Sequence, residues 1–338
     1  MKSGVQIPPP LPCKYVILTK LHKGLGKLNY KKKILVAGGA GFIGSHLCKH
    51  LLKKNYKIIC IDNLHTGKRK NISNLLENKN FKFIKHDIVN KINIKADYIL
   101  NFACPASPVA YQNDPIKTVK TCVIGTTNLL DLSKKNKSVF LQASTSEIYG
   151  DPLQHPQKEN YWGNVNPIGI RSCYDEGKRC AETLCFDYKR YYKMDVRVIR
   201  IFNTYGPNMQ INDGRVITNF INQSLNNKNI TIFGNGSQTR SFCYIDDLIE
   251  IITKIIEFKN KINQPINIGN PAEYTMKQLA KKIIKLTGTN SKIKYCKLPT
   301  DDPNKRCPDI TYAKNFFLWS PKISLNDGLI KTIDYFKN

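Results

Sequence analysis

The sequence predicts an α/β fold built on a doubly wound parallel sheet, with a smaller α/β lobe toward the C-terminus. Three observations predict it. Short apolar runs alternate with helical patterns across roughly the first 200 residues. The first run, residues 33–37, leads directly into a glycine-rich segment at 38–44 and then into a helical pattern. A chain of 338 residues, 41 % of them hydrophobic, is also long enough to bury such a sheet and a second lobe.

The first strand and helix enclose glycines at positions 38, 41 and 44, in a G-x-x-G-x-x-G spacing. Glycine at these positions allows a tight turn and lets the backbone approach a pyrophosphate at the start of the helix. A lone glycine motif is weak, but the strand before it and the helix after it are the context that a dinucleotide site requires. The segment therefore predicts a bound dinucleotide.

The second predicted strand, residues 57–61, ends at Asp62 and is followed by Asn63 and the loop residues Thr66 and Gly67. An acidic residue at this point can accept hydrogen bonds from the hydroxyls of the adenosine ribose and would repel a 2′-phosphate. This favours NAD over NADP. A purely structural turn residue remains the alternative for Asp62.

Further apolar runs at 81–84, 98–103 and 138–143 predict the next three strands, and residues 118–132 predict a helix before the last of them. Ligands on doubly wound sheets bind beyond the carboxyl ends of the strands. Asp87, Ala103 and Thr145 all lie at such ends. We therefore expect them at one edge of the sheet.

Tyr174 and Lys178 are four residues apart, so on a helix both side chains point from one face. A nearby ammonium favours the phenolate, and a phenolate can take a proton from a sugar hydroxyl. Taken alone, the pair could equally be two side chains on a solvated helix. Its position after the glycine turn and after a strand that ends in Thr145 is what favours catalysis.

Composition narrows the classes of partner. The formal net charge is +28, but the lysines are spread along the whole chain and no basic block carries interleaved aromatic residues, so we expect no nucleic-acid partner. No apolar run reaches the ~18 residues of a membrane span. The eleven cysteines form no C-x-x-C pair and no cluster at zinc-ligand spacing. They predict reduced thiols in a cytoplasmic protein without a metal site.

Longer motifs are specific to one family. They are residues 38–47, 101–108, 144–152, 163–169, 171–179, 200–207, 213–216 and 238–242, with Asp301, Asp302, Pro303, Arg306, Pro308 and Asp309. From about residue 33 to the C-terminus the chain resembles the extended short-chain dehydrogenase/reductase superfamily, which has an NAD-binding Rossmann fold. Within that superfamily it resembles the UDP-glucuronate decarboxylases.

The resemblance implies a lyase of nucleotide-sugar metabolism that makes UDP-xylose from UDP-glucuronate. In this reaction C4 of the sugar is oxidised, the resulting β-keto acid loses carbon dioxide, and C4 is reduced again with the same retained NAD. Tyr174 is then the acid/base at C4, Lys178 holds the nicotinamide ribose and lowers the pKa of Tyr174, and Thr145 positions the C4 oxygen. The cofactor-binding residues are Gly38, Gly41, Phe42, Ile43, Gly44, Asp62, Asn63, Thr66, Gly67, Asp87, Ile88, Ala103, Ala143, Tyr174 and Lys178.

The decarboxylation step is expected at Ser146, Glu147 and Arg306. Related 4,6-dehydratases carry Asp-Glu after the Thr, whereas this chain has Ser146 in place of that Asp. An arginine suits the substrate carboxylate because its fork of donors is permanently charged. A negatively charged Glu147 would repel that carboxylate, and the sequence leaves the protonation state of Glu147 open.

The resemblance also implies residues at the UDP end. Asn203, Arg215 and Arg240 are the expected contacts, beside a strand at 230–234, and Lys120 and Tyr188 are weaker candidates. For the last two, an exposed lysine and a packed helix tyrosine remain alternatives.

The expected organisation is a flexible extension over residues 1–30, a mainly NAD-binding Rossmann domain over 31–200, and a mainly UDP-sugar-binding lobe over 201–338 that is interleaved with the sheet. The resemblance further implies a homodimer. Two other functions stay open: a nucleotide-sugar 4-epimerase or 4,6-dehydratase, and a non-catalytic nucleotide-binding protein. The intact set of Thr145, Tyr174 and Lys178 argues against the last.

Overall fold

The structure is a computed structural model that describes residues 32–297 and 305–337. These residues belong to one compact unit, Lys31–Asn338. The predicted N-terminal extension, with its apolar run at 15–18, lies outside the described residues, and so do Asp301, Asp302 and Pro303. No helix of the described part is long and apolar enough to cross a membrane.

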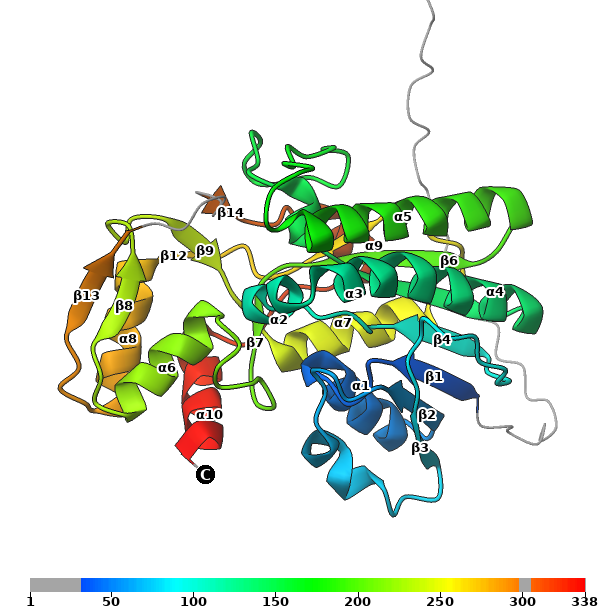
Figure 1. The fold of residues 1–338 in the computed structure, drawn as a ribbon, viewed down its shortest axis with the longest axis horizontal. Coiled ribbons are helices and arrows are strands. Elements are labelled where there is room, and N and C mark those ends of the chain that lie inside the picture. The colour runs from blue at the N-terminus through cyan, green and yellow to red at the C-terminus, as the bar shows by residue number, and fades with distance from the viewer. Residues whose placement is uncertain (1–31, 298–304, 338) are drawn as a thin grey trace, which may run out of the picture. The chain divides into compact units, whose positions relative to one another are not determined.

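A seven-stranded sheet, with every paired neighbour parallel, forms the centre of this unit (Figure 1). Its strand order is β11-β6-β5-β4-β1-β2-β3. The strands are β1 (Lys33–Ala37), β2 (Lys57–Asp62), β3 (Phe81–Lys85), β4 (Tyr98–Asn101), β5 (Val139–Thr145), β6 (Val196–Ile201) and β11 (Ile266–Ile268). The order reverses at β1, which confirms the predicted doubly wound fold.

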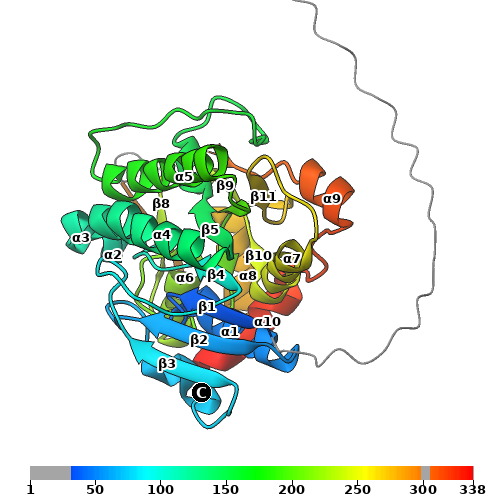
Figure 2. The ribbon, with the colours of Figure 1, turned by 90° about the vertical axis from the view of Figure 1, so that its right-hand side faces the viewer.

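Helices cover both faces of this sheet, as Figure 2 shows for α3, α4 and α5 on one side and α1 and α7 on the other. The apolar runs explain why both faces are covered. In β1, Ile34 and Val36 belong to the core that holds α1 and α7, whereas Leu35 and Ala37 belong to the core that holds α4 and α5. Successive side chains of a strand point to opposite faces, so an uninterrupted apolar strand must be buried on both.

Helices follow the glycine turn, precede the fifth strand and carry Tyr174 and Lys178, as predicted. Those around the sheet are α1 (Phe42–Lys53), α2 (Pro108–Asn113), α3 (Pro115–Lys120), α4 (Thr126–Asn136), α5 (Ser172–Tyr192), α7 (Ile245–Glu257) and α9 (Thr311–Phe317). Short turns are η1 (Arg69–Leu75), η2 (Thr121–Gly125) and η3 (Ser146–Tyr149). The helix predicted over 118–132 is thus two helices joined by the π-helical turn η2. Such turns are rare and often lie at functional sites.

The second lobe contains three small sheets, β10-β7, β12-β9-β14 and β13-β8, of which β13-β8 lies at the left of Figure 1. Their strands are β7 (Thr204–Tyr205), β8 (Ile230–Phe233), β9 (Thr239–Ser241), β10 (Cys243–Tyr244), β12 (Glu273–Thr275), β13 (Ile293–Cys296) and β14 (Lys305–Arg306). Its helices are α6 (Val216–Leu225), α8 (Met276–Thr287) and α10 (Leu325–Lys337). β11 and α7 come after residue 201 but pack with the large sheet. The boundary at residue 200 between an NAD-binding domain and a sugar-binding lobe stays a prediction.

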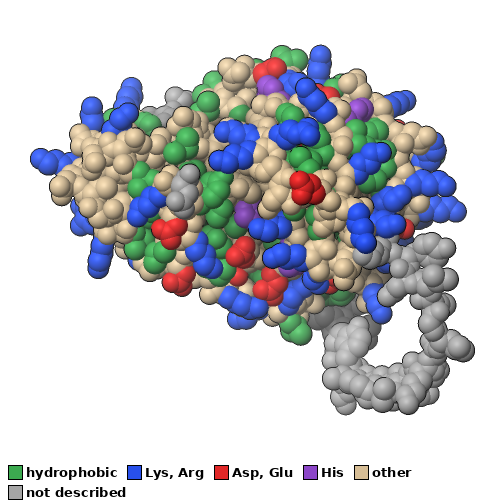
Figure 3. Space-filling model, turned by 90° about the horizontal axis from the view of Figure 1, so that it is seen from below, with side chains coloured by type: hydrophobic (Ala, Val, Ile, Leu, Met, Phe, Trp, Pro, Cys, Tyr) green, Lys and Arg blue, Asp and Glu red, His purple; other side chains and the backbone are tan. Residues whose placement is uncertain are grey.

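Lysine and arginine side chains are dispersed among neutral and acidic ones over the face shown in Figure 3. This distribution matches the spread of lysines along the sequence.

Candidate active site

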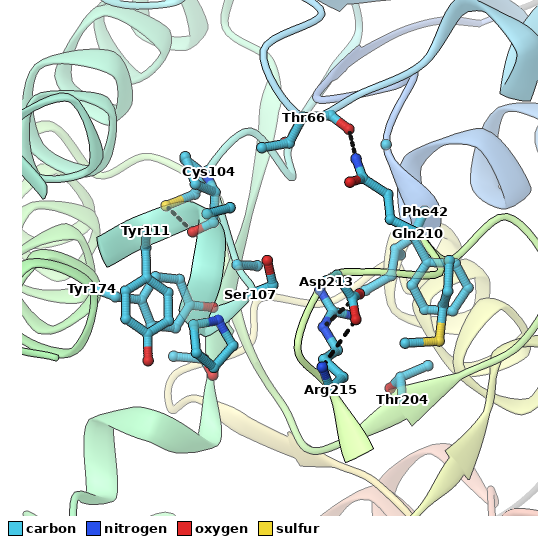
Figure 4. A pocket seen from close by; sticks show the side chains of 18 of the residues that line it. Phe42, Thr66, Cys104, Ser107, Tyr111, Tyr174, Thr204, Gln210, Asp213 and Arg215 are labelled. Carbon is cyan, nitrogen blue, oxygen red and sulfur yellow. Dashed lines mark hydrogen bonds and ion pairs between the residues drawn. The ribbon is translucent and has the colours of Figure 1, made fainter. Parts of the chain in front are cut away.

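A cavity of about 620 Å³ opens beyond the carboxyl ends of the large sheet, between that sheet and the second lobe (Figure 4). It brings together most of the residues singled out from the sequence. Those lining it are Gly38, Gly41, Phe42, Ile43, Gly44, Asp62, Asn63, Thr66, Asp87, Ile88, Ala103, Ala143, Thr145, Ser146, Glu147, Tyr174, Lys178, Asn203, Arg215, Arg240 and Arg306. Three predicted residues, Gly67, Lys120 and Tyr188, do not line it.

The glycine turn has no room for side chains. Gly38 has a φ of +74°, and a Cβ there would lie 2.6 Å from the carbonyl oxygen of Phe102. A Cβ on Gly44 would lie 2.1 Å from the carbonyl oxygen of Gly38. The first turn of α1 therefore packs directly on the end of β1, and its backbone N–H groups face a cradle suited to a pyrophosphate.

Asp62 organises the loop beside this turn. Its Oδ2 accepts a hydrogen bond from the backbone N–H of Ala40 at 3.0 Å, and its Oδ1 accepts one from Leu64 at 2.8 Å. Gly67 packs on the same carboxylate, since a Cβ there would lie 2.8 Å from either oxygen. Burial raises the pKa of Asp62, and these two hydrogen bonds oppose the rise. Asp62 thus has a structural role, and its carboxylate still borders the cavity with spare acceptor capacity for a ribose.

Asp87 is held by residues from three segments. Asn63 Nδ2 donates to its Oδ2 at 2.8 Å, Lys117 Nζ lies 3.3 Å from the same oxygen, and the N–H of Val89 donates to Oδ1. Burial opposes ionisation of Asp87, but these hydrogen bonds outweigh it and lower its pKa. Lys117 was not predicted. It lies in the cavity, whereas the predicted Lys120, three residues later on α3, is exposed.

Tyr174, Lys178 and Thr145 meet at the centre of the cavity. Lys178 is 5 % exposed and its Nζ donates to the carbonyl oxygen of Ala143 at 2.9 Å, so α5 is fixed to the end of β5. Burial and the nearby Cys104 raise the pKa of Tyr174 well above its usual value, and a hydrogen bond with Thr145 opposes the rise. In the chain alone, burial therefore outweighs the lowering of the Tyr174 pKa that we predicted from Lys178.

Glu147 lies between two guanidinium groups. Arg306 donates to Glu147 Oε1 through Nη1 and to Oε2 through Nη2, the second at 2.9 Å, and Arg171 Nη2 donates to Oε2 at 2.6 Å. Burial alone would raise the pKa of Glu147, but Arg306 and then Arg171 lower it to about 2. The sequence left the protonation state of Glu147 open. With this lowered pKa, Glu147 is ionised at neutral pH.

Two residues of this centre were missed in the sequence. Arg171 lies three residues before Tyr174, one helical turn away, and that spacing could have indicated it. The ring of Tyr111 stacks on that of Tyr174, with centroids 5.0 Å apart and planes 7° apart (Figure 4). The buried hydroxyl of Tyr111 has no hydrogen-bond partner among the described residues. This hydroxyl can therefore form a hydrogen bond with a ligand.

Tyr188 is placed differently from the prediction. It lies fourteen residues after Tyr174 on α5, which is about 21 Å along the helix axis. Its hydroxyl donates to Asp131 Oδ1 on α4 at 2.8 Å. Tyr188 is therefore a packed helix tyrosine, which was the alternative to a UDP contact.

The second lobe closes the other end of the cavity with Asn203 after β6, Arg215 before α6 and Arg240 on β9. Arg215 Nε lies 3.4 Å from Asp213 Oδ2, and Figure 4 shows both on the side opposite Tyr111 and Tyr174. The predicted strand at 230–234 is β8, and its Thr231 and Phe233 also line the cavity. Two arginines beside apolar and amide side chains suit a nucleoside diphosphate.

Comparisons with known proteins agree with this geometry. The model of the "NAD dependent epimerase/dehydratase family" matches residues 34–269. The chain is 51 % identical to UDP-glucuronic acid decarboxylase 4 of Arabidopsis thaliana over 89 % of this chain and 68 % of that protein. It is 47 % identical to UDP-glucuronic acid decarboxylase 1 of Xenopus tropicalis over 91 % of this chain and 72 % of that protein.

A solved structure shares the fold. The UDP-glucuronic acid 4-epimerase of Bacillus cereus, solved in complex with UDP-glucuronic acid and NAD, superposes with a TM-score of 0.81 at 32 % identity, covering 90 % of this chain and 99 % of that one. The glycine turn, Asp62 and Lys178 are residues that fit NAD, the cofactor of this family. The chain belongs to the NAD dependent epimerase/dehydratase family and, within it, to the UDP-glucuronic acid decarboxylases.

Proposed function

We propose that this chain is an NAD-dependent UDP-glucuronate decarboxylase, which converts UDP-glucuronate into UDP-xylose and carbon dioxide. The observation that carries the proposal is the ionised Glu147 held between Arg171 and Arg306, beside Thr145, Ser146 and Tyr174 in one cavity. The names of the relatives that are about 50 % identical supply the substrate.

NAD would be held at the glycine-turn end, with the pyrophosphate at the start of α1, the adenosine ribose at Asp62 and the nicotinamide ribose at Lys178. When bound, it supplies a reversible acceptor for the hydride of C4. Lys178 Nζ is already fixed by the carbonyl of Ala143, so its charge is positioned before any ligand binds.

At C4 the residues of this chain move one proton. Tyr174 takes the proton of the C4 hydroxyl as C4 is oxidised and returns it when C4 is reduced. Thr145, at the end of β5 and hydrogen-bonded to Tyr174, positions the C4 oxygen. Tyr111 holds the ring of Tyr174 in place by stacking on it.

At C5 and C6 the charges of the site match the substrate. Arg171 and Arg306 carry two positive charges and Glu147 carries one negative charge, so positive charge remains for the carboxylate of UDP-glucuronate, reduced by the partly ionised Asp175 beside Arg171. The predicted repulsion between Glu147 and that carboxylate is therefore offset by the arginines. Once C4 is a ketone, the carboxylate is β to it and carbon dioxide can leave with its electron pair delocalised into the carbonyl.

The alternative activities share this fold, since solved 4-epimerases and a 4,6-dehydratase superpose on the chain with TM-scores of 0.79 to 0.83. Fold alone therefore does not separate them. Ser146 stands where a dehydratase carries the Asp that protonates the leaving hydroxyl, and its hydroxyl group is too weakly acidic to replace it. This residue argues against a 4,6-dehydratase, and the experiment below separates a decarboxylase from a 4-epimerase.

Incubating the purified full chain with UDP-glucuronate and no added NAD tests the function. We expect release of carbon dioxide and formation of UDP-xylose, detected by mass spectrometry as the loss of one carbon dioxide. An isomer of unchanged mass would establish an epimerase and overturn the proposal. Adding NAD back to protein stripped of its cofactor controls for loss of NAD during purification.

We also propose a homodimer formed along α3, η2 and α5. Apolar side chains are exposed there: Ile116 is 65 % exposed, Val119 38 % and Ile124 44 %, and α5 packs beside α3 and η2. Light scattering of Ile116→Glu should show a monomer where the unchanged chain is a dimer. Leu318→Glu, at an even more exposed apolar residue after α9, should leave the dimer intact. Cytoplasmic localisation stays a prediction that imaging of a tagged chain would test.

A further inference from the structure

Two thiols are in contact at the rim of the candidate active site. Cys104 follows the end of β4, and Cys122 lies on the π-helical turn η2, 18 residues later. Their sulfur atoms are 3.3 Å apart. All ten cysteines of the described residues are free, so this contact is between two reduced thiols.

Access differs between the two sulfurs. Cys104 lines the cavity and is partly exposed, and Figure 4 shows it next to Tyr111 and Tyr174. Cys122 is 2 % exposed and does not line the cavity. It packs on Gly177 of α5, where a Cβ would lie 3.2 Å from the Cys122 sulfur. A small solute in the cavity can therefore reach the pair from the side of Cys104.

The two thiols differ in acidity. A hydrogen bond from Cys104 lowers the pKa of Cys122, burial opposes this, and the positive charge of Lys178 lowers the pKa further. Burial and the hydrogen bond to Cys122 raise the pKa of Cys104. A thiolate, not a thiol, is the nucleophile in disulfide formation. The pair thus combines two thiols in contact at 3.3 Å, the more acidic of them at Cys122, with a path to solvent through Cys104.

The chain contains a second thiol pair that lacks this access. Cys48 on α1 and Cys60 on β2 also hydrogen-bond each other, but both are fully buried behind the glycine turn. Burial raises the pKa of Cys48 well above its usual value. Cys48 and Cys60 therefore serve as an internal control: two thiols in contact that a solute in the cavity cannot reach.

We propose that Cys104 and Cys122 are a reversible oxidation site, where a peroxide closes a disulfide that stops turnover. A thiolate of the pair attacks hydrogen peroxide, takes one oxygen as a sulfenic acid and releases hydroxide, which is protonated to water. The second thiol then attacks that sulfur and expels the oxygen as a second water. Two thiols and one peroxide thus become one disulfide and two waters, and a dithiol reductant reverses the change.

The consequence for catalysis follows from distance. A disulfide needs an S–S separation of about 2.05 Å, so the 3.3 Å contact must shorten by more than 1 Å. Cys104 directly follows Ala103 in the wall of the cavity, so this movement displaces the wall beside Tyr174 and Lys178. A displacement of about 1 Å in a positioned site can lower turnover on the order of a hundredfold.

The experiment treats the purified full chain, with its bound cofactor, with stoichiometric hydrogen peroxide and then with dithiothreitol. We expect a peptide cross-linked through Cys104 and Cys122, loss of two hydrogen atoms from the intact mass, and turnover of UDP-glucuronate lowered on the order of tenfold to a hundredfold. Dithiothreitol should restore both mass and turnover. Peptides that contain Cys48 and Cys60 should remain reduced.

Two variants separate this site from general oxidation. Cys122→Ala should keep basal turnover and resist peroxide, whereas Cys296→Ala, which removes a partly exposed thiol on β13, should remain as sensitive as the unchanged chain. Peroxide inhibition of Cys122→Ala, a pair that stays reduced while turnover falls, or a closed disulfide with full turnover would each overturn the proposal. The turnover readout rests on the proposed function, but cross-link mapping does not, so the two failures are distinguishable.

Discussion

Arg306 binds Glu147 through both terminal nitrogens of its guanidinium, although the two residues are 159 positions apart in the sequence. Arg306 is 4 % exposed and comes from β14 of the second lobe, whereas Glu147 follows β5 of the large sheet. This ion pair therefore joins the large sheet to the second lobe across the cavity. It also keeps the carboxylate of Glu147 ionised.

Replacing Arg306 with methionine should lower the free energy of unfolding by about 3 kcal/mol, because it leaves the buried charge of Glu147 with Arg171 alone. Urea-induced unfolding measures the change. Arg190→Met is the matched control, since Arg190 pairs with Asp187 on the exposed side of α5 and should change the free energy by less than about 0.5 kcal/mol. Equal losses in the two variants would contradict a special role for the pair of Arg306 and Glu147.

Asp175 should destabilise the fold as the pH rises. Burial and the nearby charge of Glu147 raise its pKa to about 7, and Arg171 and Arg306 oppose the rise. Between its usual value of 3.8 and about 7 the folded chain therefore holds a proton that the unfolded chain has lost, so stability falls as the pH rises through this window.

The variant Asp175→Asn removes this effect. Relative to the unchanged chain, it should be more stable by about 1 kcal/mol or more at pH 8, and this gain should shrink toward pH 4. Thermal unfolding at several pH values measures it. Asp187→Asn, at an exposed residue of the same helix, should show no such pH-dependent gain. A constant difference across the range would show that Asp175 is ionised in the fold.

Tyr174→Phe should lower turnover of UDP-glucuronate on the order of 10²- to 10⁴-fold, because it removes the group that accepts the C4 proton. Binding of the nucleotide sugar, measured by calorimetry, should survive because the stacked ring remains. Tyr188→Phe is the matched control on the same helix: it loses only the hydrogen bond to Asp131 and should keep turnover. Near-normal turnover of Tyr174→Phe would refute the assignment of the base.

Gly44→Ala should reduce the NAD that copurifies with the chain, because its Cβ would lie 2.1 Å from the carbonyl oxygen of Gly38 and would push α1 away from the turn. The bound NAD is released by denaturation and quantified by its absorbance. Gly288→Ala, after α8, meets no atom within 4 Å; its φ of +69° strains an alanine, but Gly288 does not line the cavity, so this variant should retain NAD. Full NAD content in Gly44→Ala would show that the turn tolerates a side chain.

Much of the cofactor half of the site could be read from local sequence. The first strand was predicted at its observed bounds, because its apolar run faces a core on both sides and ends at a glycine whose φ is positive. The fifth strand was predicted over 138–143, whereas β5 begins one residue later and ends two residues later. It continues to Thr145 because β6 runs beside it as far as Ile201, and this pairing depends on a segment more than 50 residues later.

The sequence by itself determined the sheet, the glycine turn, the acidic end of β2 and the Tyr174–Lys178 spacing, because each depends on local backbone conformation or helical period. The tertiary structure decided which side chains meet. It gave Glu147 a second arginine, placed Lys117 and not Lys120 in the cavity, turned Tyr188 toward α4, and brought Cys104 to Cys122. These contacts join segments whose relative positions are set by packing around a shared core, and no local pattern records that packing.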